Sequence, residues 1–113
     1  MLTFNLNYKI KKKSEIQYLL RNSNRVSQDF FTIVFKVNSL KNDRLGVLVS
    51  RKVGNAIVRN KIKRIFREIF RTEILRSPPY YDILIQIRPG IKIISKLKYE
   101  ICFREWIIKS KTN

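Results

Sequence analysis

The sequence predicts an α+β domain, a small two-layer sandwich in which helices pack on one sheet, and three observations support this. Three segments carry apolar residues at helical spacing, and three short runs between them are rich in β-branched and aromatic residues. Their order is helix, strand, strand, helix, strand, helix, with room for one further strand before the central helix. The 113 residues include 44% hydrophobic residues and no long linker, so we expect a single domain, 1–113.

The first half of the chain is predicted to hold one helix and two strands. Apolar residues recur at helical spacing in 11–21, where Ser14 is a candidate N-cap. The run 30–37 is β-branched and aromatic and too short for a typical helix, which indicates a strand. After a polar, turn-like stretch, 45–49 alternates apolar and other residues with a period of two. We expect these two strands to pair as a hairpin.

The second half is predicted to hold a long helix, a strand and a closing helix. The long helix spans 56–75, with Asn55 as its N-cap and prolines at 78 and 79 after its end. The strand at 81–87 is almost continuously apolar, which is typical of a strand covered on both faces. The closing helix spans 95–109 and should turn four residues toward the core. These are Leu97, Ile101, Trp106 and Ile108.

Charge points to a polyanionic partner. Lys and Arg total 25 against 8 Asp and Glu, a formal net charge of +17, and both nucleic acid and anionic membrane would neutralise it. No apolar run reaches the roughly 18 residues of a membrane-spanning helix, and the N-terminal apolar residues alternate with polar ones instead of forming a signal peptide. We therefore expect a cytoplasmic protein that has no membrane partner.

Residue content argues against a self-sufficient enzyme. The chain has no histidine, which removes the commonest general base and metal ligand. The eight carboxylates are scattered, and no phosphate-binding loop or nucleophile motif is present. Cys102 is the single cysteine, so no internal disulfide forms, and a lone thiol in an apolar segment is typical of a small core residue.

The segment 49–71 carries the strongest functional signal. It holds eight basic residues and one acidic residue. At about 100° per residue its apolar side chains fall on one arc of a helix and its cations on the adjoining arc. A solvated charged face usually mixes Glu with Lys, whereas cations repeated every four residues repel one another mildly. Contact with RNA or DNA phosphates is the better interpretation, and the prevalence of arginine fits bidentate phosphate binding.

Gly54, just before the central helix, has two interpretations. A glycine there allows a phosphate to approach the helix N-terminus closely. A tight turn from strand to helix would require a glycine at the same position equally well.

These residues carry a specific family resemblance. The string KVGNAIVRNKIKRIFRE at 52–68 resembles the signature of the bacterial ribonuclease P protein component, as does its lead-in RLGVLVS at 44–50. Downstream, YDILIQIRPG at 81–90 is similar to the family's late strand and its arginine–proline end. The resemblance runs in register along nearly the whole chain. It implies a ribosomal protein S5 domain 2-like fold with a left-handed βαβ crossover through the central helix.

The resemblance also implies a function. The chain would be a non-catalytic subunit of the ribonuclease P endoribonuclease, which removes the 5′ leader of precursor tRNA. Its partners would be the catalytic RNA subunit and precursor tRNA, with no obligate protein partner. The RNA would hold most of the Mg²⁺ that the holoenzyme needs, and the protein would bind none tightly; Asn60 would at most share an ion with RNA phosphates.

The resemblance assigns site residues to two surfaces. Those expected to contact the RNA subunit are Arg51, Arg59, Asn60, Lys61, Lys63, Arg64 and Arg67. Those expected to line the cleft for the single-stranded leader are Ile16, Leu20, Phe31, Lys52 and Arg88. Lys61 stands where the family commonly has arginine, and Ile16 and Leu20 stand where it usually has aromatics. Phe31 can belong either to the core or to the cleft.

Two other classes of protein explain part of the pattern. A ribosomal or RNA-chaperone type basic RNA-binding protein explains the charge but not the contiguous motif with its matching flanks. An independent nuclease would cleave RNA without an RNA subunit, and the missing histidine argues against it.

Overall fold

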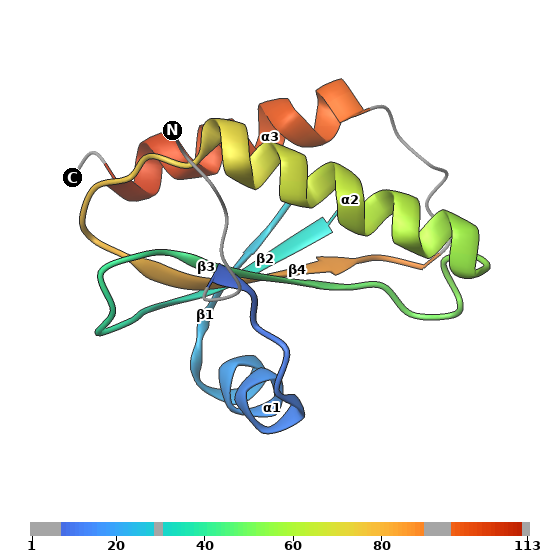
Figure 1. The fold of residues 1–113 in the computed structure, drawn as a ribbon, viewed down its shortest axis with the longest axis horizontal. Helices are drawn as coiled ribbons and strands as arrows, with labels where there is room; N and C mark the ends of the chain where they lie inside the picture. The colour runs from blue at the N-terminus through green and yellow to red at the C-terminus, as the bar shows by residue number, and fades with distance from the viewer. Residues whose placement is uncertain (1–7, 29–30, 90–95, 112–113) are drawn as a thin grey trace.

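The computed structural model describes residues 8–28, 31–89 and 96–111. It contains α1 (Lys13–Asn22), β1 (Asn24–Ser27), β2 (Phe31–Val37), β3 (Arg44–Leu48), α2 (Ala56–Glu73), β4 (Tyr81–Ile87) and α3 (Lys96–Lys111). Figure 1 shows the sheet between α1 on one face and the pair α2 and α3 on the other. The predicted α+β class is confirmed, and the additional strand, β1, precedes the two strands predicted in the first half of the chain.

The sheet has the order β1-β2-β4-β3, which makes the predicted hairpin wrong. β4 lies between β2 and β3, antiparallel to β2 and parallel to β3. The reason is burial: β4 is buried at six of its seven positions, and only an inner strand covered on both faces can bury so continuous an apolar run. The parallel pair β3 and β4 is joined through α2, as the resemblance implies; the hand of that crossover stays a prediction.

Alternating residues of the strands pack into two apolar clusters. The larger lies between the sheet and α2 with α3, where Phe31, Ile85 and Phe66 are almost completely buried. The smaller lies on the α1 side and contains Val34 and Leu84 with two residues from the N-terminal part of the chain. β4 supplies side chains to both clusters, so it is the strand that joins the two layers.

The helices match the predicted ranges more closely than the predicted details. α2 begins as expected, because the Asn55 side chain accepts a hydrogen bond from the Val58 amide at 3.0 Å. The prediction of Ser14 as an N-cap is wrong: Lys12 occupies that position in α1, with no side-chain cap.

Cys102 is half-buried against the larger cluster. Phe30 and Ser95, the first residues of two predicted elements, and Gly90, the last residue of the string at 81–90, lie outside the described residues.

α3 faces the core with a different set of residues from the predicted one. Leu97, Ile101 and Ile108 are exposed, whereas Trp106 is buried as expected. The other inward residues are Tyr99, Phe103 and Ile107. α3 is apolar around much of its circumference, so periodicity alone could not choose its buried face, and the aromatic side chains occupy the inner one.

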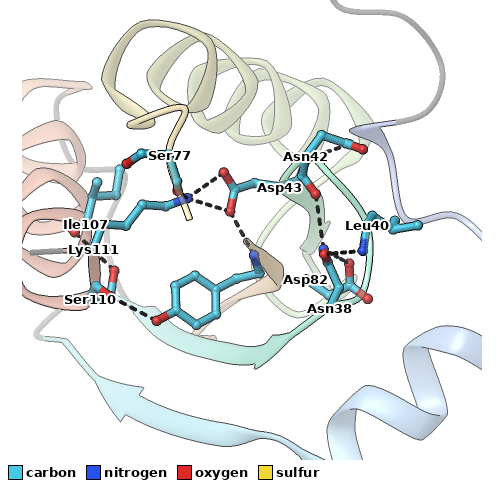
Figure 2. A network of polar contacts seen from close by, with 10 residues as sticks. Asn38, Leu40, Asn42, Asp43, Ser77, Asp82, Ile107, Ser110 and Lys111 are labelled. Carbon is cyan, nitrogen blue, oxygen red and sulfur yellow. Dashed lines mark hydrogen bonds and ion pairs between the residues drawn. The ribbon is translucent and has the colours of Figure 1, made fainter. Parts of the chain in front are cut away.

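A buried ion pair holds the end of α3 to two connecting segments (Figure 2). Lys111 Nζ, in the last residue of α3, lies 2.9 and 2.7 Å from the two carboxylate oxygens of Asp43 and donates to the Ser77 carbonyl at 2.9 Å. One Asp43 oxygen also accepts from the Tyr81 amide at 2.8 Å. The end of α3 is thereby tied to the loop before β3 and to the segment before β4. We call this network the α3 clasp.

A second network fixes α1 against the sheet. The Arg44 guanidinium donates twice to the Asp82 carboxylate, at 2.8 Å each, and once to Glu15 on α1 at 3.0 Å. These carboxylates, Asp82 first, raise the pKa of Arg44 above its ordinary value. A bidentate arginine contact of this kind restricts orientation as well as distance, so α1 keeps a defined position over β4.

Candidate nucleic-acid interface

α2 presents an almost purely cationic surface on its outer side. Ile62, Phe66 and Ile69 are buried beneath it, and the residues that the sequence assigned to the RNA subunit lie on the remaining circumference. Asn60, Lys61, Arg64 and Arg67 are exposed, and Arg59 and Lys63 are half-buried. We call these six residues the α2 cationic face. Within the described part of the chain, Arg64 makes no hydrogen bond or ion pair, so its charge is available to a partner.

The N-terminus of α2 is shaped by its own side chains. Arg59 Nη1 donates to the Gly54 carbonyl at 2.9 Å, which orients the guanidinium along the first turn. A Cβ placed on Gly54 would lie 2.9 Å from Val58 Cγ1. Packing of the turn is therefore sufficient to explain the glycine, and the phosphate-approach interpretation is not required.

A pocket of about 410 Å³ brings several predicted residues together at the β3 edge of the sheet. Its lining includes Lys63 and Arg67 from α2, Ile16 from α1, and Lys9 and Lys11 from the segment before α1. That segment is held by a bridge between Lys9 and Leu45 and by the Ile10 amide, which donates to the Leu45 carbonyl at 3.0 Å. Four cationic side chains thus converge on one pocket that no acidic residue lines.

Sequence analysis missed Lys9 and Lys11 as site residues. Their proximity to α2 depends on a parallel bridge to β3, and no local pattern in the sequence indicates that bridge.

The predicted leader residues divide between accessible and inaccessible positions. Ile16 and Leu20 are half-buried and pack, together with Leu48, against the smaller apolar cluster. Arg88 is half-buried just after β4, and its Nη2 lies 3.4 Å from Thr32 Oγ1. Ile16, Leu20 and Arg88 therefore lie around the α1 side of the sheet, and each is partly exposed.

The assignment of Phe31 to the leader cleft has to be corrected, because this residue belongs to the core. Its side chain is 0% exposed, and its ring lies 5.1 Å from Phe66 and 5.9 Å from Tyr99, centroid to centroid. In β2 it points toward α2 and α3, away from α1, so it is not available to a leader on the α1 side. The alternation of β2 places Thr32 and Val34 on the α1 side instead.

Arg51 and Lys52 are exposed in the turn between β3 and α2. The turn is closed by the Val53 amide, which donates to the Ser50 carbonyl at 3.1 Å. This turn follows the end of β3 and leads into the α2 cationic face, so Lys52 stands between the two predicted surfaces.

Arg25 is a further residue that sequence analysis missed. It lies on β1, and its guanidinium donates from Nη1 to Gln86 Oε1 at 3.1 Å and from Nη2 to the Leu20 carbonyl. The end of α1 is therefore connected through Arg25 to the middle of the sheet. β1 is only four residues long and largely polar, so strand periodicity gives almost no signal for it.

Metal binding has little support from the chain itself. No cluster of three or more Cys, Asp or Glu side chains that could hold a metal occurs in residues 8–28, 31–89 and 96–111. Asn60 offers one neutral oxygen, but its neighbours on α2 are cations, which repel Mg²⁺. The described residues thus do not fit a Mg²⁺ site unless RNA phosphates supply the remaining ligands.

None of the described helices is both long and apolar enough to traverse a bilayer.

Comparison with known proteins places this geometry in one family. A family model described as Ribonuclease P matches residues 4–110. The ribonuclease P protein component of Syntrophobacter fumaroxidans is 39% identical over 90 residues, which cover 79% of this chain and 76% of that relative.

Solved structures agree with the family assignment. The RNase P protein of Staphylococcus aureus is 33% identical, with a TM-score of 0.75 over 91% of this chain and 94% of that one. The RNase P protein of Thermotoga maritima, at 24% identity, shares the fold with a TM-score of 0.76 over 89% of this chain and 96% of that one. This chain therefore belongs to the bacterial ribonuclease P protein component family, as the protein subunit of the RNA-catalysed endoribonuclease that processes the 5′ end of tRNA.

Proposed function

We propose that this single domain acts through two surfaces: the α2 cationic face with the adjoining β3-edge pocket binds the RNA subunit, and the α1 side of the sheet binds the 5′ leader of precursor tRNA. The observation that carries the first assignment is the convergence of Lys9, Lys11, Lys63 and Arg67 on one pocket without an acidic residue. Such a site favours phosphates because each contact releases counterions from the RNA.

The RNA-subunit surface includes every residue that the family motif assigned to it. Arg51 lies in the turn before α2, and the others form the α2 cationic face. Lys61 supplies charge without the bidentate geometry of arginine. Asn60 joins a metal shell only together with RNA phosphates, so Mg²⁺ of the holoenzyme is held mainly by the RNA, and no step of the cleavage is assigned to this chain.

The leader surface is formed by Ile16, Leu20, Lys52 and Arg88, without Phe31. Apolar side chains on α1 offer contact area to unstacked bases, and the cations track the backbone of the strand. Since Ile16 and Leu20 are aliphatic, the stacking energy that an aromatic ring would supply is reduced. Cationic groups should therefore contribute more of the leader affinity than stacking does.

In this function the protein acts in the cytoplasm, bound to its RNA subunit and to precursor tRNA, with neither a membrane nor an obligate protein partner. Its contribution is to recruit the precursor through the leader and to lower the Mg²⁺ requirement by screening phosphate repulsion.

The decisive experiment is cleavage of a precursor tRNA at low Mg²⁺ by the cognate RNA subunit, with and without the protein. We expect protein-dependent cleavage at the mature 5′ end. Tight RNA binding without stimulation would favour the ribosomal or RNA-chaperone alternative. A protein-only reaction serves as the control, and cleavage in that control would support an independent nuclease.

Arg64→Ala tests the RNA-subunit surface. The substitution removes one exposed cation and should flatten the dependence of log affinity on log salt by about one unit of slope. Lys109→Ala, which removes an exposed cation from α3, is the matched control and should leave the slope unchanged. Equal slopes for Arg64→Ala and the wild type would remove Arg64 from the interface.

Lys52→Ala tests the leader surface. We expect the holoenzyme to lose affinity for precursor tRNA while its affinity for mature tRNA stays the same, because only the precursor carries a leader. Lys41→Ala changes an exposed lysine in the β2–β3 loop, at the opposite end of β3, and should affect neither substrate. An equal loss for both tRNAs would show that Lys52 does not contact the leader.

A further inference from the structure

A row of side chains crosses the α1 side of the sheet beside α1. Strand register places Ser27, Thr32, Gln86 and Leu48 opposite one another on β1, β2, β4 and β3. Thr32, Gln86 and Leu48 are half-buried, and Ser27 is exposed. Leu48 packs with Ile16 and Leu20, so the row adjoins the proposed leader surface. Ser27, Thr32 and Gln86 are the members of the row that can form hydrogen bonds to a base.

Arginines at both sides fix the hydrogen-bonding direction of this row. A guanidinium can only donate, so the Gln86 side-chain oxygen must face Arg25, at 3.1 Å from Nη1. The amide plane then directs the Gln86 NH₂ group away from Arg25. Thr32 Oγ1 likewise faces the Arg88 guanidinium, at a longer 3.4 Å, which leaves the hydroxyl hydrogen free to point elsewhere.

We infer that Gln86, oriented by Arg25, determines base specificity in the leader by donating from its amide NH₂ group to a keto base, uracil or guanine, in preference to cytosine or adenine. This inference rests on the proposed leader surface and names the chemistry of one contact within it. Uracil O4 and guanine O6 accept hydrogen bonds, whereas cytosine N4 and adenine N6 carry amino groups that donate. In an unpaired leader these edges are open to side chains.

The preference follows from the lack of an alternative orientation. A free glutamine can rotate its amide to serve either kind of base, because it carries both a donor and an acceptor. Here rotation would place the NH₂ group against the Arg25 guanidinium, two donors facing each other. The amino group of cytosine or adenine would therefore face the Gln86 NH₂ group, which is also a donor. Two donors that face each other lower affinity more than a neutral contact does.

The test is competition between precursor tRNAs that differ by one leader nucleotide. Precursors with U or C at each leader position in turn are cleaved together by the holoenzyme, and the ratio of their kcat/KM values is measured. We expect one position at which U is preferred by about three- to tenfold, the value of one hydrogen bond. Gln86→Ala should abolish that preference while leaving affinity for the RNA subunit unchanged.

Two further variants test whether the orientation of the Gln86 amide determines the base preference. Gln86→Glu pairs one carboxylate oxygen with Arg25 and offers the other as an acceptor, so the preference should reverse to C. Arg25→Ala releases the amide, so the ratio should fall toward equality even though Gln86 is present. Gln17→Ala, an exposed glutamine on α1, is the matched control and should keep the wild-type ratio.

Failure of the inference is distinct from failure of the proposed function. If the wild-type holoenzyme does not bind precursor more tightly than mature tRNA, the leader surface itself is wrong. If it does, but no leader position shows a preference for U, or the preference survives Gln86→Ala, then the specificity role of Gln86 is overturned and the leader surface stands.

Discussion

Replacing Lys111 with methionine should destabilise the fold strongly, because Lys111 is the centre of the α3 clasp. The exposed fractions of the Lys111 and Asp43 side chains are 0% and 4%, and the ammonium group also lies 5.1 Å from the centroid of the Tyr80 ring. Methionine keeps the aliphatic stem and much of the volume but leaves the Asp43 carboxylate buried beside an apolar side chain. Breaking a buried pair from one side costs about 3 to 5 kcal/mol.

We expect a value near the lower end of that range. Asp43 keeps its hydrogen bond from the Tyr81 amide at 2.8 Å, and a well-filled site adds little cavity energy. A loss of about 3 kcal/mol corresponds to a decrease in Tm of roughly 12 °C for a domain of this size. Thermal unfolding followed by circular dichroism measures it, and Asp43→Asn combined with Lys111→Met should recover part of the loss because no charge is then buried.

The loss should also depend on pH. Burial raises the pKa of Asp43, and hydrogen bonds from Lys111 and the Tyr81 amide oppose that rise. The folded state therefore holds a proton more tightly than the unfolded state, so this group lowers the free energy of unfolding as the pH rises from the ordinary Asp pKa through the raised one. Without Lys111 the pKa rises further, so the effect of Lys111→Met should be smaller at about pH 4 than at about pH 7. A Tm decrease below about 3 °C, or the same decrease at both pH values, would refute this account of the clasp.

Three smaller perturbations test other parts of the fold. Gly46→Ala places a Cβ 2.7 Å from Leu84 Cδ2 and should lower the free energy of unfolding in urea by about 1 to 3 kcal/mol; an unchanged midpoint would mean that the two layers adjust freely. Asn55→Ala removes the cap of α2 and should cost about 1 kcal/mol in the same assay, and no loss would contradict the capping role. Arg44→Lys replaces the bidentate contact with Asp82 by a single point charge and should cost about 1 to 2 kcal/mol; full wild-type stability would show that charge alone positions α1.

Elements whose apolar residues follow a clear pattern were predictable from the sequence. α2 combines a capping Asn55 with an apolar arc of sufficient length, and β4 is a continuous apolar run, so each pattern has one structural solution. The position of β4 between β2 and β3 was not predictable from local pattern, because pairing depends on which strand needs cover on both faces. The predicted hairpin of β2 and β3 was wrong for that reason. It was based on the proximity of the two strands along the chain, whereas burial determines which strands pair.

Side-chain direction was the least predictable property. Phe31 suits a core and a base-stacking surface equally well, and only the alternation of β2 relative to α2 decides between them. α3 has apolar residues on opposite sides: Leu97 and Trp106, nine positions apart, lie about half a turn from each other, so periodicity leaves two candidate buried faces. Aromatic packing inside the larger cluster determines which face of α3 is buried.

Long-range polar contacts carried no sequence signal. Asp43 and Lys111 are 68 positions apart, and each resembles an ordinary surface residue in its local context. The link from Arg25 to Gln86 spans 61 positions and begins in a strand too short for periodicity. The cationic face of α2 was predictable because all its members lie on one helix.

The two edges of the sheet differ in how they resist pairing with another molecule. At β3, the Ile10 amide already occupies the Leu45 carbonyl, and Lys9 adds a charge beside the bridge. At the other edge, the four residues of β1 are too few to nucleate a stable intermolecular strand, and Arg25 adds a further charge there. Short, charged or covered edge strands prevent two sheets from pairing edge to edge. Both edges of this sheet are therefore protected by the chain itself, and protection does not depend on a bound polyanion.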